Sequence, residues 1–139
     1  MRDDVDNCIE MHVKQALAVS FIPLVSAPVV WGVCVKMIVR LDGIFGIPTA
    51  KGWDSEILHD VMAGVIAAPV LAIPLLGAGA AAVFVRSIGT SYANAVESVL
   101  AVATEEERVD VNYVSTHVKA ALKKQHEEKR ERRRARRAS

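Results

Sequence analysis

The side chains that most often carry chemistry in enzymes are scattered along this chain. The histidines are His12, His59, His117 and His126. None of them belongs to an H-E-x-x-H pattern, in which two histidines on one helix face bind zinc. No serine stands in the G-x-S-x-G pattern of a nucleophile, and the two cysteines, Cys8 and Cys34, lack a C-x-x-C spacing and are expected to be buried thiols. The sequence therefore predicts no catalytic residue and no metal site, and we expect a protein that is not an enzyme.

A glycine-rich stretch, GAGAAA, contains the spacing of a dinucleotide-binding turn. Gly77, Gly79 and Ala82 match the pattern G-x-G-x-x-[GA]. That turn has to follow a strand of a parallel sheet, but Pro74 stands where the strand would be, and a central strand tolerates proline poorly. No other segment supports such a sheet, so we expect no cofactor and no small-molecule substrate.

The clearest signal for a partner is the tail, residues 123–139, KKQHEEKRERRRARRAS. It contains nine lysine and arginine residues and three glutamates, so its net charge is +6, whereas the remainder of the chain carries −5. Guanidinium groups donate paired hydrogen bonds that suit phosphate and carboxylate. We expect the contacts to come from Lys123, Lys124, Arg130, Arg132, Arg133, Arg134, Arg136 and Arg137.

Three interpretations of this tail are open. It can be a solvated helical end, it can bind an acidic neighbouring subunit or anionic lipid headgroups, or it can bind nucleic acid. Nucleic acid is the least favoured partner, because no aromatic side chains are interleaved to stack on bases. We adopt contact with an anionic protein partner or lipid as the prediction.

The elements that must carry this tail are helices. Apolar residues recur at spacings of three and four, and no segment alternates with a period of two, so the predicted class is all-α. We expect helices over about residues 4–22, 25–45, from Asp54 or Ser55 to near Pro69, 76–103, and from Asp110 onward. Gly43, Gly46 and Pro48 are expected to end the second helix, and Asp110 to cap the fifth.

An internal repeat organises the four apolar helices. Ile22-Pro23-Leu24 recurs as Ile73-Pro74-Leu75, which predicts two repeated units of helix, IPL bend and helix, followed by a C-terminal basic amphipathic helix. Pro23, Pro74, Gly77 and Gly79 are the residues expected to bend the helices and allow close packing. The alternative is a chance similarity in a chain rich in alanine and valine.

Two long uncharged blocks, Gln15–Val35 and Val61–Val85, indicate a membrane. Each exceeds the ~20 residues that a spanning helix needs. If each block bends at its IPL, the half-helices are too short to span, and the block either dips into one leaflet or folds as a soluble four-helix core. We predict a membrane protein, integral or inserted by hairpins, and the soluble bundle is the alternative.

The pattern ALAVSFIPLVSAPVVWGVCVKMIVRLDGIFGIP, followed by APVLAIPLLGAGAAAVFVRSIGTSYANAVESV, covers about residues 12–100. It resembles the uncharacterised helical-hairpin domain found beside Era-like GTPase domains in bacterial membrane proteins. The shared features are an IP bend before a long helix with a glycine-containing stop, then a second turn, here Pro74 to Gly77, and an Ala-rich helix. The resemblance implies that any nucleotide chemistry belongs to a partner, because the chain has no GTPase motif.

The sequence thus predicts two domains. Residues 1–105 form an apolar helical domain inserted in a membrane, and residues 106–139 form a basic helical tail. The predicted function is that of a non-enzymatic accessory or structural subunit of a larger membrane complex. The alternative is a soluble or peripheral helical module that couples to a partner GTPase.

Overall fold

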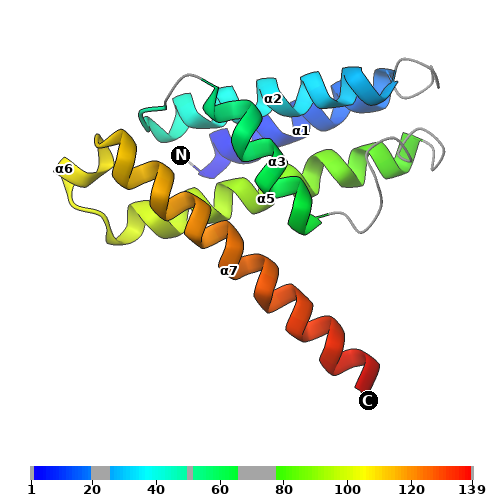
Figure 1. Ribbon diagram of the computed structural model, residues 1–139. Coiled ribbons are helices and arrows are strands. Elements are labelled where there is room, and N and C mark those ends of the chain that lie inside the picture. The colour runs from blue at the N-terminus through cyan, green and yellow to red at the C-terminus, as the bar shows by residue number, and fades with distance from the viewer. Residues whose placement is uncertain (1, 20–25, 50–51, 66–77, 139) are drawn as a thin grey trace.

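The computed structural model describes residues 2–19, 26–49, 52–65 and 78–138 (Figure 1). These ranges contain six helices and no strand, which confirms the predicted all-α class. The helices are α1 (Arg2–Val19), α2 (Ser26–Phe45), α3 (Trp53–Val65), α5 (Ala78–Val102), α6 (Glu105–Arg108) and α7 (Val111–Ala138). Of the predicted bend residues, Pro23, Pro74 and Gly77 lie outside the described residues, and Gly79 lies in the first turn of α5.

The end of α2 follows directly from its sequence. Gly46 has a φ of +67°, in the left-handed region that glycine enters without a steric penalty. The amide of Ile47 then donates to the carbonyl oxygen of Asp42 at 3.2 Å, which satisfies a carbonyl of the last turn. The expected stop is therefore confirmed at Gly46, whereas Gly43, which was also expected to end the helix, lies inside α2.

The start of α3 differs from the expectation that Asp54 or Ser55 would cap it. The helix begins at Trp53, and Gly52, with a φ of +83°, takes the position before it. The carbonyl oxygen of Gly52 accepts from the amide of Glu56 at 3.1 Å. The prediction was wrong because glycine makes the turn, which leaves the Asp54 side chain available for contacts in the interior.

Side-chain caps define the turn between α5 and α7. The hydroxyl of Thr104 accepts from the amide of Glu107 at 3.2 Å, and the Glu107 carboxylate accepts from the Thr104 amide at 3.0 Å, a capping box that starts α6. The carboxylate of Asp110 accepts from the amides of Asn112 and Tyr113 at 2.9 and 3.2 Å. The prediction that Asp110 caps the fifth long helix is confirmed.

Helices α1, α2 and α5 lie side by side, and α3 and α7 lie across them (Figure 1). Ion pairs from Arg2 to Glu97 at 2.5 Å and from Arg86 to Glu10 at 3.1 Å place α1 antiparallel to α5. Their contact is close at Gly89, where an added Cβ would lie 2.8 Å from Ile9 on α1 and 2.9 Å from Met37 on α2. Glycine therefore sets the distance between these three helices. Among the largest side chains sealed in the resulting core are Tyr92, Met37, Ile38, Leu41, Ile57, Leu58, Ile88 and Leu122.

Helix α7 contributes to this core along only part of its length. Val114, Val118 and Leu122 are buried at a spacing of four residues, as the buried face of an amphipathic helix requires. From Lys123 onward no side chain of the described part is fully buried. The change in packing thus falls after Leu122, inside α7, whereas the predicted division at residue 105 stays a prediction.

The predicted membrane insertion also stays a prediction. Within the described ranges, none of the helices has both the length and the apolar character that crossing a membrane requires.

Candidate functional site

The most exposed charged element is the second half of α7, residues 123–138, which we call the basic arm. The arm is about 24 Å long at 1.5 Å per residue, and its C-terminal end extends past the other helices (Figure 1). All eight predicted contact residues lie on it, and each is exposed to solvent. The arm thus presents these cations on one exposed helical segment, and their contact with an anionic partner stays a prediction.

Contacts with α3 and α5 hold α7 in place just before and at the start of the basic arm. Lys119 pairs with the carboxylate of Glu56, and its ammonium lies 5.7 Å from the centre of the Trp53 ring. On the arm itself, Gln125 donates to the carbonyl oxygen of Ser91 at 3.4 Å. Burial lowers the pKa of His126, which lines a small cavity with Asp60 between α3 and α7. These contacts fix the direction in which the arm leaves the body.

The C-terminal end of α1 and the N-terminal ends of α2 and α5 meet at one end of the molecule, which we call the uncharged end (Figure 1). The charged residues nearest to this end on the three helices are Lys14, Lys36 and Arg86, all of them basic and exposed. Val29 and Val83, closer to the end, expose 37% and 62% of their surface. Apolar surface is therefore bordered by positive charge here.

The opposite end of the body has the opposite charge. Residues 2–6, residue 97 and residues 105–110 contain eight acidic and two basic side chains, a net charge of −6, and we call this region the acidic end. The ion pair between Arg2 and Glu97 brings the start of α1 to the end of α5. The acidic residues and the basic arm are thus carried on different parts of the surface.

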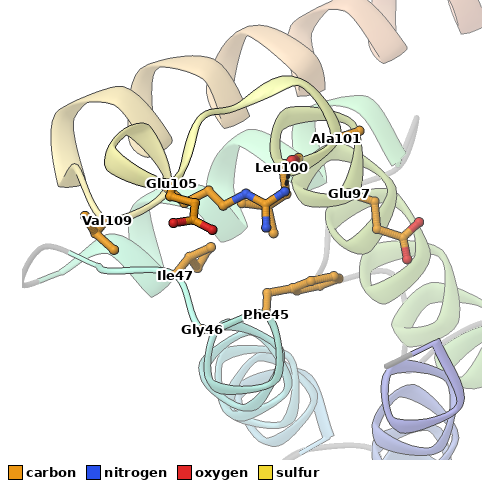
Figure 2. Close-up of a pocket in the computed structure, with 9 residues that line it drawn as sticks. Phe45, Gly46, Ile47, Glu97, Leu100, Ala101, Glu105 and Val109 are labelled. Carbon is orange, nitrogen blue, oxygen red and sulfur yellow. Dashed lines mark hydrogen bonds between the residues drawn. The ribbon is translucent and has the colours of Figure 1, made fainter.

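A cavity of about 510 Å³ opens at the acidic end (Figure 2). Its apolar lining comes from Phe45, Ile47, Leu100, Ala101 and Val109. Figure 2 shows the Glu105 side chain extending over Ile47, while Glu97 lies on the α5 side.

Arg108 also lines this cavity. Its guanidinium donates to the carbonyl oxygen of Leu100 at 2.8 Å, in the last turn of α5, where a cation is favourable. In the part of the chain that the structure describes, it forms no ion pair with Glu97 or Glu105.

A buried polar network joins α2, α3 and α5. The Tyr92 hydroxyl donates to the Asp42 carboxyl and accepts from the Trp53 indole at 3.2 Å. The pKa of Asp42 is raised to about 8, mainly by burial and also by the neighbouring Asp54 carboxyl group, while the hydrogen bond from Tyr92 acts to lower it. One oxygen of Asp42 and one of Asp54 are buried without a hydrogen-bond donor among the described residues, so a proton on Asp42 lets the two carboxyl groups satisfy each other. The network links three helices, and Asp42, Trp53 and Tyr92 are all buried.

The cysteines are not arranged for nucleophilic chemistry. Both are buried and unpaired, as expected. Burial raises the pKa of the Cys8 thiol and raises that of Cys34 to about 12, so both stay protonated near neutral pH. His12 donates from Nδ1 to the Cys8 carbonyl oxygen at 2.7 Å, which occupies the nitrogen nearest the thiol. No cluster of three metal-ligating side chains occurs among the described residues.

Sequence reasoning missed Asp42, Tyr92 and Arg108. A signal for Asp42 was present, because it is the only acidic residue in the otherwise apolar or basic helix α2. No such signal marked Tyr92 or Arg108, whose roles depend on helices that are distant in sequence.

Comparison with known proteins finds no match to a family model, a curated protein or a solved structure. The resemblance to the hairpin domain beside Era-like GTPases therefore stays a prediction.

Proposed function

We propose that this chain is a small, non-enzymatic accessory subunit of a membrane complex. Its uncharged end rests in the bilayer surface, and its basic arm binds anionic lipid headgroups. The observation that carries the proposal is the separation of charge, with apolar surface, basic border and basic arm on one side and the acidic end on the other.

The charge pattern supports one orientation on an anionic membrane. Lysine and arginine near such a surface contribute about 1 kcal/mol each. Lys14, Lys36 and Arg86 would lie at headgroup level once Val29 and Val83 enter the interface, because basic side chains can extend from an apolar region to the headgroups. The acidic end would be repelled, so it would face away from the lipid.

Hairpin insertion is the form of membrane contact that we propose. Support comes from the packing of α1 against α2, whose ends at Val19 and Ser26 are separated by only a short connection. The first uncharged block would then reverse direction within its length. In this proposal, the predicted bends at Pro23 and Pro74, which lie outside the described residues, belong to the inserted part.

The basic arm would act through charge alone. After Leu122, α7 has no apolar side chain larger than the alanines Ala135 and Ala138. It therefore lacks the apolar face with which an interfacial helix enters a bilayer. Binding of this kind weakens with salt, because exposed charges are screened.

Flotation of the full chain with lipid vesicles tests the proposal. We expect binding to vesicles that contain phosphatidylserine, and weaker binding at high salt. Replacing Arg130, Arg132 and Arg133 by glutamine should weaken binding roughly 100-fold, from the loss of ~1 kcal/mol at each site.

A matched control replaces Glu105, Glu106 and Glu107 by glutamine, which changes the same number of charges at the acidic end. This variant should bind the vesicles at least as well as the parent. Absence of binding to any vesicle would overturn the proposal and favour the soluble helical module. If the two triple variants bound the vesicles equally well, the basic arm would not contribute to membrane binding.

A further inference from the structure

The cavity at the acidic end has the size and lining of a binding site that the membrane contact does not use. Its volume, about 510 Å³, lies within the ~300–1,000 Å³ of typical ligand pockets. Phe45 and Ile47 form a buried apolar base, and Val109 at its edge is 71% exposed (Figure 2). An occupant must therefore bring apolar surface.

The charged groups around the cavity favour an occupant with positive charge. The Glu105 carboxylate has no ion-pair partner among the described residues. The single cation lining the cavity, Arg108, donates to the end of α5 at the Leu100 carbonyl oxygen. With a net charge of −6 over the acidic end, an anionic lipid or a nucleic acid would be repelled, whereas a cationic group would be attracted.

We propose that this cavity binds a basic amphipathic segment of a partner protein. An apolar side chain of that segment enters between Phe45, Ile47 and Val109, and a lysine or arginine one turn away pairs with Glu105. Helices that bind in grooves commonly present their anchoring side chains at such spacings. The contact goes beyond the membrane function, because the acidic end lies opposite the uncharged end and stays accessible when that end is on a bilayer.

A second copy of this chain fits the cavity less well. Its basic arm would supply the positive charge, but residues 123–138 offer only alanine to fill an apolar cavity. The larger apolar side chains that precede the arm, Val114, Val118 and Leu122, are already part of the core. The charge and the apolar lining together therefore favour a separate partner.

The test uses the full chain and a fluorescent helical peptide built from leucine and lysine, followed by anisotropy. We expect the peptide to bind, and a peptide with glutamate in place of lysine not to bind. Ala101→Trp, which fills the cavity from an exposed position on α5, should weaken binding at least roughly tenfold, as loss of an anchor does. Glu105→Gln should also weaken binding of the peptide, and Glu127→Gln on the basic arm should leave that binding unchanged.

Several results would overturn the proposal. Equal affinity for Ala101→Trp and the parent would mean that charge alone holds the peptide. Stronger binding by a peptide of residues 123–139 would assign the cavity to a second copy, and displacement by decanoate with no effect of Glu105→Gln would assign it to a small amphiphile. Vesicle flotation of Ala101→Trp keeps the two proposals apart, because this variant should still bind membranes.

Discussion

The two halves of α7 share one continuous backbone but differ in what they do for the protein. In residues 111–122, Val114, Val118 and Leu122 seal the core, and Lys119 fastens the helix to α3. In residues 123–138 no side chain is fully buried and most are charged. A helical backbone can therefore continue whether or not its side chains are buried. A segment joins the core only where apolar side chains recur every third or fourth residue. The first half should therefore determine stability, and the second half binding.

The largest expected effect is on the core half. Leu122 is 1% exposed, and Leu122→Ala removes buried methyl groups and leaves a cavity, so it should lower the unfolding free energy by about 2–5 kcal/mol. Urea denaturation measures this change. The neighbouring exposed residue is the control, and Lys123→Ala should change stability by less than about 0.5 kcal/mol. Similar effects at both positions would contradict the division of α7 after Leu122.

The second prediction concerns a charge inside the body, in contrast to the solvated charges of the arm. The pKa of Asp42 is about 8 in the folded protein, above its unfolded value near 3.8. The stabilisation that folding gains from protonated Asp42 is therefore complete below about pH 4 and is lost as the pH rises through 8. The unfolding free energy should fall by up to about 1.4 kcal/mol per pH unit in that window. Asp42→Asn, whose amide can donate to Asp54 at every pH, should remove this slope.

Denaturation of Asp42→Asn and the parent across that pH range measures the difference. Other titrating groups, including His12 and His126, are present in both proteins and largely cancel. If the unfolding free energies of the two proteins differed by the same amount at every pH between 4 and 8, Asp42 would not take up a proton on folding.

A third, smaller effect tests the close contact of the body helices. Gly89→Ala places a methyl group 2.8 Å from Ile9 and 2.9 Å from Met37, so neighbouring side chains must move. We expect a loss of about 1–3 kcal/mol in stability, despite the higher helix propensity of alanine. Combining it with Met37→Ala, which makes room, should cost less than the sum of the two single changes, and strict additivity would argue against the contact.

The smallest effect is expected in the arm. Replacing Arg130, Arg132 and Arg133 by glutamine should change the unfolding free energy by less than about 0.5 kcal/mol, because exposed substitutions remove no packing. Thermal unfolding checks this. A large loss of stability would show that the arm stabilises the fold, which would contradict the division of α7 into a stabilising half and a binding half.

The local features of this fold could be predicted from the sequence. Periodicity placed the five long helices close to their observed positions, and Gly46 and Asp110 marked two of their boundaries. The start of α3 was missed, since Gly52 rather than an aspartate precedes it. Propensity, periodicity and caps act over a few residues, so a single sequence contains the information for them.

The sequence also showed that the tail is basic and the remainder of the chain is acidic. It did not show where on the folded molecule the charged groups lie. Only the packing of the helices brings Arg2 to Glu97, and Asp42 to Tyr92, and creates the cavity beside Arg108. These contacts join residues fifty or more positions apart, and they depend on which faces of the helices bury each other. The sequence by itself thus determined where helices begin and end and which faces are apolar, whereas the tertiary structure decided which side chains meet.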